Sequence, residues 1–208
     1  MSQTSKPNGF RLVKNLAGGA MTAQTEMFFV PSTDATVIMV GDAVTLAGDA
    51  RSPTGTPTVT RLASATGIPV GIVVGITYEG MGDSQNVPPV DNLNTPVYRR
   101  ANTDRYLMVC TDPNAVYEVQ LAGAGPAAAA ATAMVGLNGQ FTLTAGNTSS
   151  GASGMQLDSA GQATTATLPL KIVGFPYRPD NTPGDPFFSF WVKLNSATYG
   201  TGTGTAGV

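Results

Sequence analysis

Val70-Gly-Ile-Val-Val-Gly-Ile-Thr-Tyr78 is the most informative stretch of this 208-residue sequence. It is a continuous apolar run rich in β-branched residues, and it is too short to span a membrane. Such a run predicts a strand that is buried on both faces and crosses the core of a β-rich domain. Its two glycines, Gly71 and Gly75, indicate a β-bulge or the close approach of another backbone segment.

Short runs of the same kind recur on both sides of this strand. Gly, Pro, Asn and Asp separate them, and the steps Gly41-Asp42 and Gly48-Asp49 have the chemistry of tight turns. The expected strands are 37–40, 43–46, 58–62, 105–111, 116–121, 140–144, 155–158, 167–175 and 187–194. This spacing is typical of all-β proteins, so we expect a compact β-barrel or β-sandwich body. One short helix is expected at 127–131, because Pro126 precedes it and Gly136 follows.

The composition along the chain predicts three regions. Residues 1–35 are polar and interrupted by Pro and Gly, which favours an extended N-terminal arm that something else must tether. Residues 36–195 form the β-rich body, either as one unit or as two sub-domains divided near 80–100. Residues 196–208, rich in Gly and Thr, form a flexible tail that floats or docks elsewhere. A polar loop at 81–96 is long enough to make contacts of its own.

Charge is scarce in this chain. Charged residues make up 12% of it and hydrophobic residues 42%, with a formal net charge of -2. Such an uncharged surface is typical of a protein whose faces are covered in an assembly. The only local basic cluster is Arg99, Arg100 and Arg105, which would neutralise few phosphates, so we expect no nucleic-acid partner. No run reaches the ~18 apolar residues of a membrane span, so we expect no membrane partner either.

Catalytic residue types are almost missing. The chain has no histidine, which removes the commonest general base and His-dependent triads and metal sites. Its single cysteine, Cys110, lies in an apolar run and is expected to pack in the core. We therefore expect no enzyme activity, no cofactor and no metal site. A carboxylate pair for glycoside hydrolysis stays open as a weaker alternative, although most aspartates occur in turn contexts.

Several segments carry a resemblance to a known class of proteins. They are Asn8-Gly-Phe-Arg-Leu-Val13, Phe29-Val-Pro-Ser-Thr-Asp-Ala35, Val40-Gly-Asp-Ala-Val-Thr-Leu-Ala-Gly48, Pro69-Val-Gly-Ile-Val-Val-Gly75, Val116-Tyr-Glu-Val-Gln120 and Leu170-Lys-Ile-Val-Gly-Phe-Pro-Tyr-Arg-Pro-Asp-Asn181. In this order the chain resembles small virion structural proteins of tailed bacteriophages. Residues 41–75 are similar to the compact β domain of capsid decoration, or cement, proteins.

The resemblance implies a role on the outside of the virion capsid, after synthesis in the host bacterial cytoplasm. Proteins of this kind clamp the major capsid protein and associate with themselves, so we expect a homotrimer or else a dimer. It brings no catalytic residues. The expected interface residues are Arg11, Phe28, Phe29, Arg99 and Arg100, because arms and arginines commonly anchor interfaces.

A different function remains open at this point. The chain is alternatively a tail, fibre or head-fibre adhesin that binds host surface glycans. Exposed aromatic side chains such as Tyr78, Tyr98 or Tyr177 would then act as platforms for sugar rings.

Overall fold

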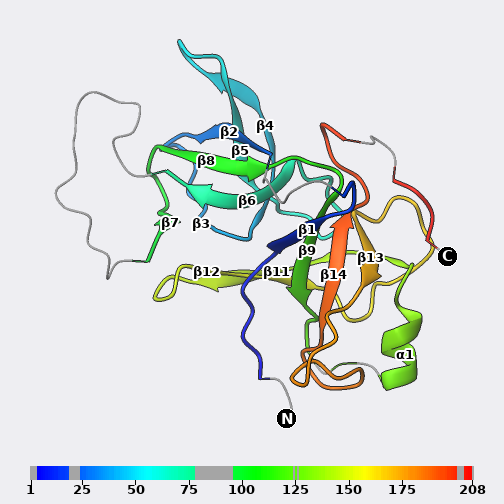
Figure 1. Ribbon diagram of the computed structural model, residues 1–208. Helices are drawn as coiled ribbons and strands as arrows, with labels where there is room; N and C mark the ends of the chain where they lie inside the picture. The colour runs from blue at the N-terminus through cyan, green and yellow to red at the C-terminus, as the bar shows by residue number, and fades with distance from the viewer. Residues whose placement is uncertain are drawn as a thin grey trace.

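The computed structural model describes residues 4–18, 24–77, 96–123, 125, 127–200 and 204–207. The expected all-β class is confirmed, because these residues form many short strands and a single short helix (Figure 1). The elements are β1 Arg11–Asn15, β2 Thr25–Val30, β3 Ile38–Met39, β4 Ala43–Arg51, β5 Thr56–Arg61, β6 Gly71–Ile76, β7 Tyr98–Arg99, β8 Arg105–Cys110, β9 Ala115–Gln120, α1 Ala128–Ala133, β10 Asn138–Gly139, β11 Phe141–Asn147, β12 Ala152–Leu157, β13 Leu170–Gly174 and β14 Ser189–Leu194.

A closed barrel forms the first half of the fold, with strand order β2-β5-β4-β6-β8. Antiparallel pairing joins β2 to β8 along its whole length, and one parallel pair, Phe29 with Thr58, closes the barrel between β2 and β5. As expected, β6 is buried and carries a bulge between Val73 and Gly75. Gly71 meets the neighbouring strand closely, since a Cβ there would lie 2.3 Å from the carbonyl oxygen of Cys110.

An antiparallel sheet of order β1-β9-β14-β13-β10 forms the second half. Its inner face supplies Tyr117, Ile172 and Val192 to a core that the β11–β12 hairpin also covers. Ile72 and Cys110 from the barrel belong to the same core, so the two halves pack on each other. Cys110 is buried there, as predicted. The helix expected at 127–131 is α1.

The N-terminal segment corrects the expectation of an arm over residues 1–35. The described part of it contributes β1 to the antiparallel sheet and β2 to the barrel. Its Gly and Pro residues separate two strands that pair with distant partners, and they do not keep the segment extended. The division between the two halves also differs from the expected 80–100, because it falls after β8. Most of that interval, 78–95, lies outside the described residues.

The C-terminal residues dock on the body where the structure describes them. Ser196 and Ala197 are buried, and the Thr205 backbone N–H donates to the Asn195 side chain at 3.0 Å. Asn138 Nδ2 donates to the Thr205 carbonyl at 2.7 Å. Of the two outcomes expected for the tail, these residues take the docked one.

Candidate interaction surface

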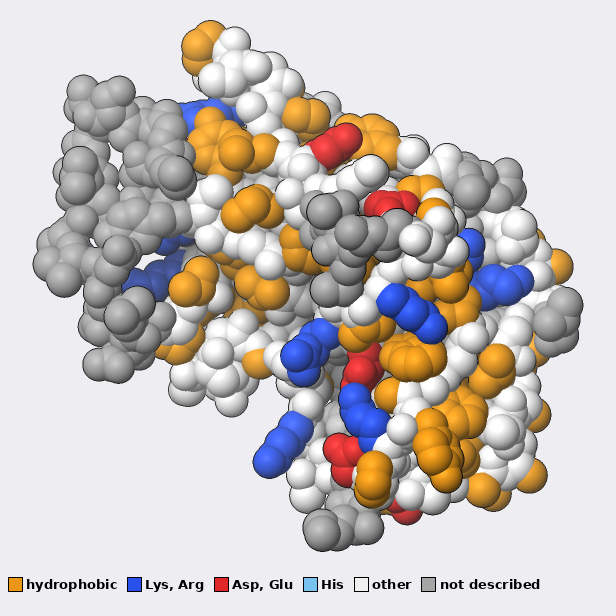
Figure 2. Space-filling model, in the orientation of Figure 1, with side chains coloured by type: hydrophobic (Ala, Val, Ile, Leu, Met, Phe, Trp, Pro, Cys, Tyr) orange, Lys and Arg blue, Asp and Glu red, His pale blue; other side chains and the backbone are white. Residues whose placement is uncertain are grey.

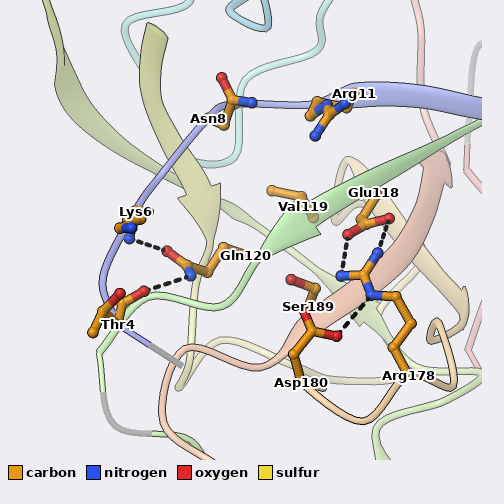
Figure 3. A pocket seen from close by; sticks show the side chains of 11 residues that line it. Thr4, Lys6, Asn8, Arg11, Glu118, Val119, Gln120, Arg178, Asp180 and Ser189 are labelled. Atoms are coloured by element: carbon orange, nitrogen blue, oxygen red, sulfur yellow. Dashed lines mark hydrogen bonds and ion pairs between the residues drawn. The ribbon is translucent and has the colours of Figure 1, made fainter. Parts of the chain in front are cut away.

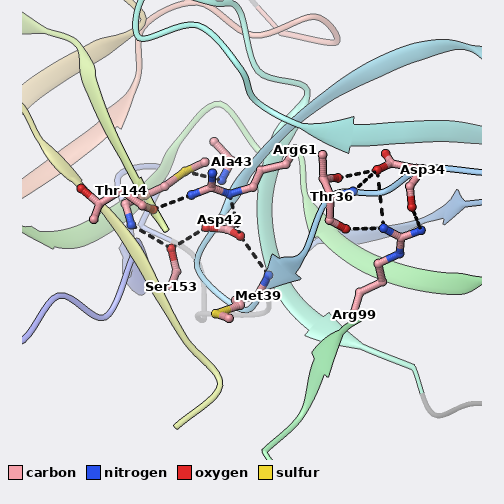
Figure 4. A network of polar contacts seen from close by, with 10 residues as sticks. Asp34, Thr36, Met39, Asp42, Ala43, Arg61, Arg99, Thr144 and Ser153 are labelled. Atoms are coloured by element: carbon pink, nitrogen blue, oxygen red, sulfur yellow. Dashed lines mark hydrogen bonds and ion pairs between the residues drawn. The ribbon is translucent and has the colours of Figure 1, made fainter. Parts of the chain in front are cut away.

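One buried polar network fastens the barrel to the β11–β12 hairpin (Figure 4). Asp42 accepts hydrogen bonds from the Ser153 hydroxyl at 2.6 Å and from the Met39 backbone N–H at 2.9 Å. Arg61 reaches Asp42 at 3.2 Å and donates to the Thr144 carbonyl at 2.6 Å. Burial raises the pKa of Asp42, and the opposing pull of Arg61 does not cancel this effect. The network is structural, because every member has a partner inside the fold.

Arg99 holds a second buried network. Its guanidinium donates to the carbonyls of Pro31, Asp34 and Thr103 at 2.8, 2.7 and 3.0 Å, and also to that of Thr36. The Asp34 carboxylate lies 3.5 Å away. Burial raises the pKa of Asp34, but hydrogen bonds from Thr36 outweigh it and leave this pKa lowered. Arg99 therefore fixes the loop that follows β2.

The expected interface residues fall into two groups. Phe28 has an exposed fraction of 1% and packs in the barrel core, while Phe29 is buried against Tyr106. Arg99 is buried as well, so these three side chains serve the interior of the chain. Arg11 and Arg100 lie on the surface, at β1 of the antiparallel sheet and just after β7. The structure does not bring these two arginines together.

The residues that the structure describes hold no cluster suited to a metal ion. No three of their Cys, Asp and Glu side chains lie close enough together to hold a metal ion. Burial raises the pKa of Tyr117, whose hydroxyl donates to the Cys110 carbonyl at 3.5 Å. No described helix has the length and apolar character to cross a membrane.

The barrel carries an exposed projection. The β4–β5 hairpin stands clear of the other elements in Figure 1, and residues 47–50 and 52–55 are exposed. Asp49 and Arg51 are the only charged residues between 47 and 57. On the outer face of the barrel, Met27 and Met108 are cross-strand partners with exposed fractions of 54% and 39%. We name residues 47–57 the barrel projection.

A cleft of about 410 Å³ lies in the other half of the molecule, between the segment before β1 and the C-terminal end of β9 (Figure 3). Arg178 closes one side, where it donates to both Glu118 carboxylate oxygens at 2.8 and 3.1 Å. Gln120 holds the opposite wall, since its side chain accepts from the Lys6 backbone N–H at 3.2 Å. The lining includes Lys6 and Arg11, which have no ion-pair partner among the described residues.

The tyrosines proposed as sugar platforms differ in exposure. Tyr177 has an exposed fraction of 94%, whereas Tyr98 is half-buried. Tyr78 lies outside the described residues. Tyr177 is not among the residues that line the cleft, although its neighbour Arg178 is.

No family model matches the chain, and neither a curated protein nor a solved structure is significantly similar to it.

Proposed function

We propose that the protein is a decoration, or cement, protein of a tailed-bacteriophage head. It binds the outside of the capsid and stabilises the shell of major capsid protein by protein–protein contact. The observation that carries this proposal is the barrel projection, an exposed hairpin tip with no net charge that adds no residue to the hydrophobic core of its own chain. The sequence resemblance described above points the same way.

The mechanism is burial of surface. Pairing of Ala50 with Pro57 and of Arg51 with Thr56 orders the projection, and the Thr58 hydroxyl donates to the Asp49 carbonyl at 2.8 Å. This order reduces the conformational entropy that is lost when the projection docks. An interface of ~1,000 Å² removes apolar area from water at ~25 cal/mol per Å² before the costs of association. Many copies on one shell add their effects, and this strengthens the shell against the pressure of packaged DNA. A homotrimer, or else a dimer, would place several projections on adjacent capsid subunits.

Reconstitution of expanded shells tests the proposal. Shells with and without the protein are heated, and DNA release is followed by dye fluorescence. We expect the protein to raise the release temperature. Thr54→Lys, which places a charge at the exposed tip of the barrel projection, should reduce shell binding. Thr148→Lys is the matched control, because it adds the same charge at an exposed turn of the β11–β12 hairpin. Absence of shell binding by the unaltered protein would refute the proposal.

A second candidate function rests on Tyr177. An almost fully exposed tyrosine next to Arg178 and Asp180 suits an adhesin that binds host glycans, because aromatic faces stack on sugar rings. Densitometry of purified virions separates the two candidates. A cement protein is present in hundreds of copies, whereas a fibre adhesin is present in few. Loss of glycan binding in Tyr177→Ser would favour the adhesin.

A further inference from the structure

The outer face of the antiparallel sheet concentrates positive charge. Lys14 of β1, Lys193 of β14 and Lys171 of β13 lie in one cross-strand row, because Lys14 and Lys193 both pair with Val116, and Lys193 pairs with Lys171. Directly opposed residues of antiparallel strands point to the same face. Tyr117 follows Val116 in β9, so its side chain points to the opposite face of the sheet, and it belongs to the hydrophobic core. The lysines therefore face outward.

A second row and the cleft extend this positive face. Arg11 pairs with Glu118, which pairs with Trp191, so these three side chains share the outward side. Lys6 and Arg178 line the adjoining cleft. Figure 2 shows the blue side chains gathered in a band over this half of the molecule. We name the outward side chains of β1, β9, β14 and β13, together with the cleft, the basic face. It holds six of the eleven Lys and Arg residues of the chain: Lys6, Arg11, Lys14, Lys171, Arg178 and Lys193.

Little within the chain neutralises the basic face. Glu118 and Asp180 are its two carboxylates, and both are bonded to Arg178. Lys14 lies 3.8 Å from the centre of the Trp191 ring, and Lys171 donates to the Ala206 carbonyl. Lys193 has no ion-pair partner among the described residues. Like charges directly opposite on neighbouring strands destabilise a sheet, so the pair Lys171 and Lys193 is a cost to the isolated chain.

We propose that the basic face binds an acidic polypeptide segment of a partner protein, with carboxylates meeting Arg11, Lys193 and the cleft. Guanidinium and ammonium groups on a sheet surface match the carboxylates of an extended acidic strand. The lining of the cleft has no aromatic side chain on which sugars or bases could stack, and the Lys14 ammonium already covers the Trp191 ring of the basic face at 3.8 Å. This feature favours a polypeptide over a glycan or a nucleic acid. The inference goes beyond the proposed function and does not depend on a capsid partner.

A synthetic glutamate-rich peptide is the probe. Its binding to the full chain is measured by fluorescence anisotropy of the labelled peptide. Trp191 is the only tryptophan and lies on the basic face, so its emission reports the place of binding. We expect the peptide to bind at low ionic strength, to shift Trp191 emission, and to weaken as salt is added.

Matched variants locate the site. Arg11→Gln combined with Lys193→Gln should raise the Kd about two- to thirtyfold, since each of the two exposed charge pairs contributes ~0.2–1 kcal/mol. Arg100→Gln removes a positive charge from an exposed position outside the basic face and should leave the Kd within about 1.5-fold. Circular dichroism confirms that all variants are folded.

Three results would overturn the inference. The first is no peptide binding, or binding without a change in Trp191 emission. The second is equal weakening by Arg100→Gln and by the Arg11→Gln, Lys193→Gln double variant, which would indicate general charge attraction. The third is tighter binding of polygalacturonate or of single-stranded DNA than of the peptide, which would assign the face to another polyanion. Loss of peptide binding in the Arg11→Gln, Lys193→Gln double variant, with its shell binding unchanged, would support the inference and place the shell contact of the proposed function elsewhere.

Discussion

Replacement of Arg99 by methionine is expected to destabilise the protein more than any surface change. Arg99 is buried and donates to four backbone carbonyls, of Pro31, Asp34, Thr36 and Thr103. Each buried acceptor that loses its donor costs about 1–3 kcal/mol. Water that enters the vacated space will donate hydrogen bonds to some of these carbonyls and so reduce the loss. We therefore expect a loss of about 3–5 kcal/mol in the free energy of unfolding, as for other broken buried networks.

The assay is urea unfolding followed by Trp191 fluorescence and by circular dichroism. A loss of this size corresponds to a fall in Tm of roughly 6–20 °C for a chain of this length. The neighbouring variant Arg100→Met is the control and should change the stability by less than about 0.5 kcal/mol, because Arg100 is exposed. If the free energy of unfolding of Arg99→Met lies within about 1 kcal/mol of that of the parent protein, the network does not stabilise the fold. If Arg99→Met has normal stability but no longer binds the shell, Arg99 is an interface residue, as the sequence predicted.

Two other predictions concern stability and pH. Gly71→Ala should cost about 1–3 kcal/mol, because its Cβ would meet the Cys110 carbonyl at 2.3 Å. Gly48→Ala is the comparison: a Cβ there meets no other atom, but the φ of 87° is unfavourable for alanine, so the cost should be roughly 1 kcal/mol. A lower urea midpoint for Gly48→Ala than for Gly71→Ala would contradict the close strand contact. The raised pKa of Asp42 means that the native state binds this proton more tightly than the unfolded state. The parent protein should therefore gain stability relative to Asp42→Asn as the pH falls from neutral towards 3.8; a flat or opposite difference in urea titrations would refute this sign.

Local composition predicted most strands, because short apolar runs bounded by Gly, Pro and Asp leave few alternatives. The strand expected at 105–111 corresponds to β8, and the strand expected at 187–194 contains β14. The same logic failed for β1 and β2. Each is stabilised by a partner far along the chain, β9 and β8 respectively. β1 has no long apolar run, and the apolar run 27–30 of β2 lies among the Gly and Pro residues that indicated an arm.

The interface residues were harder to predict for a related reason. Arg99 belongs to the only local basic cluster, but burial depends on which loop folds over it, and local sequence does not contain that information. The basic face could not be predicted because its residues are far apart in the sequence. Lys14 and Lys193 are separated by most of the chain and share a face only through the register of β1, β9 and β14. No window of sequence brings them together.

The pairing of β1 with β9 has a consequence for biosynthesis. The barrel strands lie between residues 25 and 110 and can pair with one another as soon as they leave the ribosome. Arg11–Asn15 leaves first but must wait for Ala115–Gln120, on the order of 100 residues later, which takes ~5–20 s at ordinary rates of synthesis. During that interval the nascent chain exposes β1 without its partner, and β2 waits almost as long for β8. Early chaperone contacts should therefore include Arg11–Asn15, and release of this segment should follow completion of β9.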